Sequence, residues 1–116
     1  MIDRPKKLTA RFFETAAGQK PVRVWLLELN ATDRRMIGYD VQTVEFGWPL
    51  GMPTCRALGG GLWEVRSNLS NGTIGRVIFC IVSGEMVLLH GFIKKTQKTP
   101  PHDLDLADKR RKEIRG

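Results

Sequence analysis

The first half of the chain carries one alternating segment followed by two segments with helical spacing. Residues 7–13 alternate apolar and polar side chains closely enough to predict a strand. Residues 21–29 carry apolar side chains at i, i+3, i+4 and i+7, the spacing of an amphipathic helix. A second helix is predicted to begin at Thr32 or Asp33, because either side chain can cap it, and to end before Gly47.

The second half of the chain predicts three strands in succession, over residues 62–68, 73–82 and 86–95. Asn71-Gly72 and Ser83-Gly84-Glu85 are compact turn sequences that join them. Two helices followed by such a meander predict an α+β fold. In this fold the two N-terminal helices pack on one face of a small, mainly antiparallel sheet.

Two segments outside these elements carry further expectations. Trp48, Leu50 and Met52 lie in a predicted loop and are expected to pack across the core. A last helix is predicted to begin near Thr99, whose hydroxyl can cap it, and to run through Ile114. Its apolar stripe is thin and its other faces are charged, so docking on the rest of the protein must supply most of its stability.

Composition describes one basic globular domain, residues 1–116. The chain has 41% hydrophobic residues, a net charge of +7 and a pI of about 9.9. Residues 94–116 hold eight lysines and arginines against four acidic residues, so one fifth of the chain carries more than half of the excess charge. A basic face of this kind suits nucleic acid or an acidic protein partner. No segment is long enough to span a bilayer, and we expect no membrane partner.

Cysteine usage and the short motifs limit the kinds of metal, redox or cofactor site that the chain can contain. Cys55 and Cys80 stand alone in apolar surroundings, without a CxxC pair or a histidine at zinc spacing. They are expected to be small core residues of a cytoplasmic protein. A strand is predicted after Gly59-Gly60-Gly61, so the glycines indicate a turn and not a phosphate-binding loop. The sequence contains no metal-binding or nucleotide-cofactor motif, and we expect neither a metal nor a cofactor.

Charged residues inside the predicted strands are the first candidates for a functional site. Alternation places Glu64 and Arg66 on one face of their strand, and Arg76 lies across the following hairpin turn. Two arginines that converge on a sheet face lower the stability of the fold unless an anion lies between them. That anion can be a substrate phosphate or, in the simpler interpretation, the carboxylate of Glu64.

The end of the third predicted strand is the second candidate. An apolar run ends in Lys94 and Lys95, and Lys98 follows with no acidic residue nearby. Three cations at a strand end suit an anionic ligand, and the same pattern also protects an edge strand from aggregation. Alternation places His90 on the same face as Leu88, where it can transfer protons or serve as a hydrogen-bonded core residue.

Three segments in this order resemble the phage-derived branch of the RelE/HigB toxin family: LWEVR at 62–66, GRVIF at 75–79 and LHGFIKKTQKTP at 89–100. The specific element is the pattern HGFxKKTxKTP, and the resemblance extends over residues 7–114. It implies a small α+β toxin of a type II toxin–antitoxin module with a basic C-terminal helix. Relatives of this kind bind the ribosome and cut mRNA there without a metal.

The resemblance also implies partners and site residues. A helix-turn-helix antitoxin silences such toxins, and the two proteins bind operator DNA as a complex. By position, Arg66 and Arg76 match the arginines that engage the scissile phosphate, and Lys94 and Lys95 match the basic cluster at the end of the last strand. Further cations are expected to contact RNA or the ribosome: Lys98, Lys109, Arg110 and Arg111.

Proton transfer is the point at which this chain departs from the family pattern. No tyrosine follows the last strand, and the only one is Tyr39, on the second predicted helix. The 2′-OH of RNA is itself the nucleophile, so catalysis needs cations for the phosphate, a general base and a general acid. His90, Glu64 and a lysine with a lowered pKa are the candidates for proton transfer.

Two other functions compete with the nuclease. A related toxin can bind DNA gyrase without catalysis, and a basic domain can be a non-enzymatic RNA-binding module. The arginine pair favours the nuclease, because a gyrase binder needs no convergent phosphate site. The sequence shows no exposed row of aromatic residues for stacking single-stranded bases, which fits a protein that relies on the ribosome to position its RNA.

Overall fold

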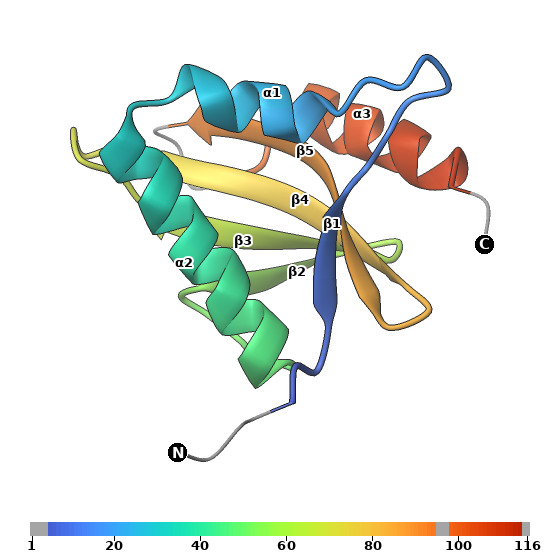
Figure 1. Cartoon of the computed structure of the whole chain (residues 1–116), viewed down its shortest axis with the longest axis horizontal. Coiled ribbons are helices and arrows are strands. Elements are labelled where there is room, and N and C mark those ends of the chain that lie inside the picture. The colour runs from blue at the N-terminus through green and yellow to red at the C-terminus, as the bar shows by residue number, and fades with distance from the viewer. Residues whose placement is uncertain (1–4, 95–97, 115–116) are drawn as a thin grey trace.

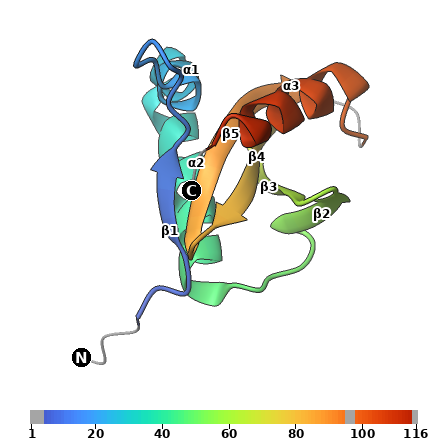
Figure 2. The same cartoon turned by 90° about the vertical axis from the view of Figure 1, so that its right-hand side faces the viewer.

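The computed structural model describes residues 5–94 and 98–114. The elements in chain order are β1 (Thr9–Phe12), α1 (Pro21–Glu28), α2 (Ala31–Gly47), β2 (Cys55–Gly59), β3 (Leu62–Asn68), β4 (Ile74–Val82), β5 (Glu85–Lys94) and α3 (Pro101–Lys112). The strands form one sheet between two helical layers. The helices α1 and α2 cover one face, and α3 covers the other (Figure 1, Figure 2).

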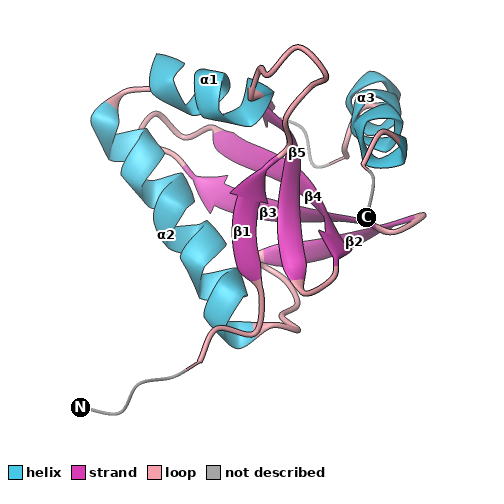
Figure 3. Cartoon of the chain, turned by 45° about the vertical axis from the view of Figure 1, so that its right-hand side comes forward, coloured by secondary structure: helices cyan, strands magenta, loops and turns pink. Residues whose placement is uncertain are grey.

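The strand order in the sheet is β1-β5-β4-β3-β2. The strand β1 runs parallel to β5, and every other neighbouring pair is antiparallel (Figure 3). The predicted α+β class is confirmed, with two N-terminal helices on a mainly antiparallel sheet and a basic C-terminal helix. One strand, β2, was not predicted, because its sequence CRALG runs into glycines that signal a turn.

The cap of α2 differs from the prediction: it is Asn30, and neither Thr32 nor Asp33. The side-chain oxygen of Asn30 accepts a hydrogen bond from the Asp33 backbone N–H at 2.8 Å. The Asp33 carboxylate instead binds the turn between β3 and β4, where it accepts from the Ser70 N–H at 2.9 Å. This hydrogen bond is the main reason that the pKa of Asp33 lies below its usual value.

The face under α1 and α2 holds a continuous apolar core. Ile37, Val41 and Val44 of α2 pack there with Val65 of β3 and other buried strand residues. The helix α1 lies on β5 so closely that a Cβ atom built at Gly91 would lie 2.3 Å from the Trp25 ring. A residue larger than glycine therefore cannot occupy position 91 unless the indole moves.

The loop after α2 contributes part of the predicted packing. Trp48 and Leu50 pack against the apolar core, and Trp48 meets Trp63 edge to face with ring centroids 4.8 Å apart. Met52 is 57% exposed, so the prediction that it packs across the core is wrong. Residues 52–54 form the turn that leads into β2, and this turn carries the Met52 side chain outward.

The opposite face carries a second apolar cluster under α3, in which Cys80 and Leu89 pack with Ala107 of the helix. Cys55 and Cys80 are both buried free thiols, as predicted. Burial raises the pKa of Cys55 to about 11, so this thiol is unreactive at neutral pH. Among the described residues, no helix combines the length and apolar character needed to cross a membrane.

A bulge in β5 changes which side chains face α3. Leu88 pairs with Phe79 and His90 pairs with Ile78, so Leu89 is an extra residue in β5. The alternation of side chains shifts at this point. His90 faces α3 together with Leu89, whereas Leu88 belongs to the core under α1 and α2. The prediction that His90 and Leu88 share a face is therefore wrong.

Candidate functional site

A row of charged side chains crosses β2, β3 and β4 on the face toward α3. Arg56 of β2 is the register partner of Glu64 of β3, and Arg66 of β3 is the register partner of Arg76 of β4. Oε1 of Glu64 lies 3.9 Å from Nε of Arg66 and 4.0 Å from Nη1 of Arg76. We call these four residues the arginine cluster. The two predicted arginines thus lie side by side, near one carboxylate.

The arginine cluster is largely buried. The side chains of Glu64 and Arg76 have no exposed area, whereas 10% of the Arg66 side chain is exposed. Burial lowers the pKa of the Arg76 guanidinium, Glu64 opposes this shift, and Arg66 and Arg56 add to it. Counted over these four residues alone, three arginines accompany one carboxylate, which is an excess of positive charge. An anion that approached Arg66 from solvent would reduce this excess.

Thr99 closes the arginine cluster from the side of α3. Its hydroxyl donates to Oε2 of Glu64 at 2.6 Å, and the residue is 4% exposed. The predicted role of Thr99 as the helix cap is therefore wrong. The helix α3 starts after Pro100, which provides no side-chain cap. The Thr99 hydroxyl instead satisfies one oxygen of a carboxylate that is withdrawn from water.

Two further polar contacts hold α3 on β5. Nε2 of His90 lies 2.6 Å from Oδ1 of Asp103, and the His90 ring stacks on Phe92 with centroids 5.3 Å apart. Nη1 of Arg110 donates to the Leu89 carbonyl at 2.8 Å, which satisfies the oxygen of the bulge residue. His90 and Arg110, both predicted to act on RNA, are thus engaged in docking α3 in this structure.

The predicted lysines are more accessible than the arginines. Lys94 at the end of β5, Lys98 before α3 and Lys109 on α3 are all exposed. Lys95 lies outside the described residues. Arg111 is partly buried, and its Nη2 lies 2.7 Å from a carboxylate oxygen of Asp108, its neighbour on α3. The exposed lysines lie at the end of β5, just before α3 and on α3.

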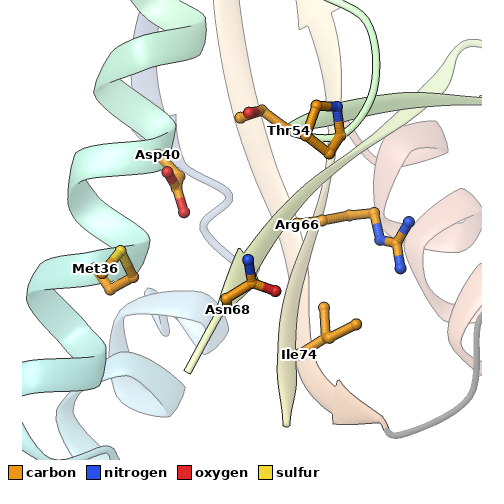
Figure 4. A pocket seen from close by; sticks show the side chains of 7 residues that line it. Met36, Asp40, Thr54, Arg66, Asn68 and Ile74 are labelled. Carbon is orange, nitrogen blue, oxygen red and sulfur yellow. The ribbon is translucent and has the colours of Figure 1, made fainter. Parts of the chain in front are cut away.

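An open pocket of about 350 Å³ lies beside Arg66 (Figure 4). We call it the β3-edge pocket. It forms because β2 pairs with β3 only from Leu62 to Val65 and leaves the last part of β3 next to α2. The lining residues are Met36 and Asp40 of α2, Pro53 and Thr54 before β2, Arg66 and Asn68 of β3, and Ile74 of β4.

Arg66 belongs to both the pocket and the arginine cluster. In Figure 4 its guanidinium points away from Asp40 and α2, and its Nε lies near Glu64. The side chain thus borders the open pocket and ends beside the buried charges. Arg66 is the member of the cluster that a ligand in the pocket can approach.

Sequence reasoning missed Asp40 and Asn68 as lining residues of this pocket. Asn68 had a detectable signal, because it continues the alternation that places Glu64 and Arg66 on one face. Asp40 also had one, since it follows Met36 by one helical turn, outside the apolar stripe of α2. No local pattern could place that turn of α2 beside the end of β3.

The comparisons with known proteins identify the family of the chain. Residues 24–112, most of the chain, match the family model described as phage derived protein Gp49-like (DUF891). No curated protein matched the chain. The Gp49-like family is a RelE/HigB-type toxin family, which agrees with the resemblance of the strand sequences. The chain therefore belongs to the Gp49-like family of phage-derived, RelE/HigB-type toxins.

Proposed function

We propose that this protein is the toxin of a type II toxin–antitoxin module and that it cuts mRNA on the ribosome. Its family supports a toxin that acts with an antitoxin. The observation that supports a nuclease is the arginine cluster, in which Arg66 and Arg76 are direct cross-strand neighbours and Arg66 borders an open pocket. Arginine suits this role because its planar fork can bind two phosphate oxygens at once.

In the proposed reaction the 2′-OH of one nucleotide attacks the adjacent phosphorus, and the bond to the 5′ oxygen of the next nucleotide breaks. The products are a 2′,3′-cyclic phosphate and a free 5′-OH, so the reaction needs no metal and no added nucleophile. A general base takes the 2′-OH proton, and a general acid protonates the leaving oxygen. Arg66 binds a nonbridging oxygen of the phosphate, where negative charge grows in the transition state.

The other charged residues support Arg66 or attract RNA. Glu64 lies inside the protein and holds the Arg66 guanidinium in position, and Arg76 adds positive charge beside it. The RNA backbone is attracted by Lys94, Lys95 and Lys98. The ribosome is contacted by Lys109, Arg110 and Arg111 of α3. Because such contacts release counterions, binding to the ribosome should weaken steeply as salt is added.

The proposed regulatory partner is a helix-turn-helix antitoxin protein in the same cytoplasm. A chain with a net charge of +7 fits a partner that presents an acidic segment. The antitoxin would silence the toxin by covering its basic surface. Operator DNA would be bound only by the complex, through the helix-turn-helix of the antitoxin.

The test is expression of the chain without an antitoxin, followed by mapping of mRNA 5′ ends with and without translation. We expect new ends on translated messages only, and Arg66→Ala should reduce cutting by about 10²–10³-fold. Arg35→Ala is the matched control, because Arg35 is exposed on α2 away from the cluster, and it should cut normally.

Two outcomes would overturn the proposal. Growth arrest with intact mRNA would indicate a toxin that binds another target, such as DNA gyrase, without cutting RNA. Normal cutting by Arg66→Ala would remove Arg66 from the phosphate site.

A further inference from the structure

We infer that the β3-edge pocket binds one nucleotide of the RNA substrate and that Asn68 recognises its base. This inference rests on the proposed function, because it assigns the part of the substrate that lies next to Arg66. The pocket volume of about 350 Å³ falls within the range of small-ligand sites, roughly 300–1,000 Å³.

The lining of the pocket combines the groups that a nucleotide requires. Met36, Pro53 and Ile74 provide apolar surface for the flat faces of a base. Asn68 presents a side-chain amide, which has both donor and acceptor atoms and can bind two adjacent positions on a base edge. Asparagine makes this bidentate contact most readily with adenine.

The charges of the pocket argue against a site for a bare phosphate. Among the described lining residues, Arg66 and Asp40 are the charged ones, and their charges offset each other. A free anion would meet the Asp40 carboxylate. A nucleotide avoids this repulsion, because its phosphate can lie toward the Arg66 guanidinium while its sugar hydroxyl donates to Asp40. A carboxylate that accepts from the 2′-OH also distinguishes RNA from DNA.

The pocket is accessible without a rearrangement of the fold. Asn68 is exposed, and Met36 is 42% exposed, so a nucleotide can enter from solvent. The Glu64 carboxylate, in contrast, is fully buried and bonded to the Thr99 hydroxyl. A nucleotide seated in the β3-edge pocket would therefore place its phosphate at Arg66, the member of the cluster that lines this pocket.

The test is NMR titration of the ¹⁵N-labelled chain, residues 1–116, with each of the four ribonucleoside 3′-monophosphates and with inorganic phosphate. We expect the backbone amides of Thr54 and Asn68 to shift, with one nucleotide preferred and inorganic phosphate having little effect. Asn68→Ala should weaken the preferred nucleotide about tenfold, since a bidentate base contact of this type is lost. Gln42→Ala removes an exposed amide on α2 outside the pocket and should bind like the parent chain.

A second variant tests the sugar contact. Asp40→Asn should reduce the preference for a ribonucleotide over the matching 2′-deoxyribonucleotide while leaving the preferred base unchanged. Equal shifts with all four nucleotides and inorganic phosphate, or unchanged binding by Asn68→Ala, would overturn the inference. If the chain binds nucleotides as expected but cuts no mRNA, the nucleotide site stands and only the proposed nuclease activity is refuted.

Discussion

The two faces of the sheet differ in where their polar groups lie. Under α1 and α2 the middle of the face is apolar, and polar contacts lie at the ends of α2. At one end Asp33 binds the Ser70 N–H, and at the other the Glu45 carboxylate accepts from the Ala10 N–H at 2.7 Å. Under α3 the polar groups lie within the face itself, where Glu64 is fully buried.

This difference distinguishes a layer that stabilises the fold from the layer that carries the proposed site. Apolar packing is non-directional and stabilises the α1–α2 face at little electrostatic cost. A buried group of arginines with one carboxylate contributes little to the stability of a fold, because desolvation opposes the attraction between the charges. Such a group is useful where positive charge must be held in place for an anion.

The helix α3 shows the same contrast. Among its described residues only Ala107 is buried, and Leu104 packs partly buried against the same cluster. The contacts of Asp103 and Arg110, and of Thr99 just before the helix, add polar attachment. A layer with little apolar burial opens at lower free energy than a packed core. We therefore expect α3 to exchange its amide hydrogens sooner than α2.

The largest effect is expected from Glu64→Gln, which removes the carboxylate from the centre of the α3 face. The buried arginines would then lose the negative charge of Glu64, and the free energy of unfolding should fall by about 3–5 kcal/mol. Urea unfolding measures this loss. Glu28→Gln, at an exposed position on α1, is the control and should change stability by less than about 0.5 kcal/mol. If Glu64→Gln lost as little stability as the control, the stability of the fold would not depend on the carboxylate of the cluster.

Local patterns in the sequence predicted much of this arrangement. Arg66 and Arg76 could be placed together because strand alternation and a short hairpin turn are both local properties. The bulge at Leu89 could not be predicted, because one extra residue in an apolar run leaves the pattern apolar on both sides. That residue moved His90 to the face of α3.

The contacts that complete the site are long-range, which is why sequence reasoning missed them. Thr99 and Glu64 are 35 residues apart, and their hydrogen bond depends on how the segment before α3 crosses the sheet. Thr99 therefore looked like a helix cap, the local role of a threonine before two prolines. Asp40 reaches the neighbourhood of Arg66 only through the packing of α2 at the edge of β3.

An intermediate effect is expected from Gly91→Ala, which disturbs the apolar face. The new Cβ would lie 2.3 Å from the Trp25 ring, so α1 or the indole must move. We expect a loss of about 1–3 kcal/mol in the free energy of unfolding. Gly38→Ala is the matched control on α2, where a Cβ meets no atom within 4 Å. It should stabilise the protein by about 0.5–1 kcal/mol, and a stabilising Gly91→Ala would contradict the close packing of α1 on β5.

The smallest effect is expected from acid titration of one carboxylate in each helical layer. The pKa of Asp33 is lowered chiefly by the Ser70 backbone N–H, and that of Asp108 chiefly by the Arg111 side chain. A carboxylate with a lowered pKa stabilises the fold above its ordinary pKa of about 3.9. That stabilisation is lost as the pH falls through the lower pKa of the folded state.

The two carboxylates should differ because their contacts differ in range. Asp33 joins α2 to the turn between β3 and β4, whereas Asp108 binds Arg111 and Lys112 of its own helix. Asp33→Asn should therefore flatten the fall of unfolding free energy below about pH 4 more than Asp108→Asn does. Urea unfolding at a series of acidic pH values measures both slopes. Equal flattening would mean that a contact confined to α3 stabilises the whole fold as much as a contact between elements, which would contradict the weaker attachment of α3.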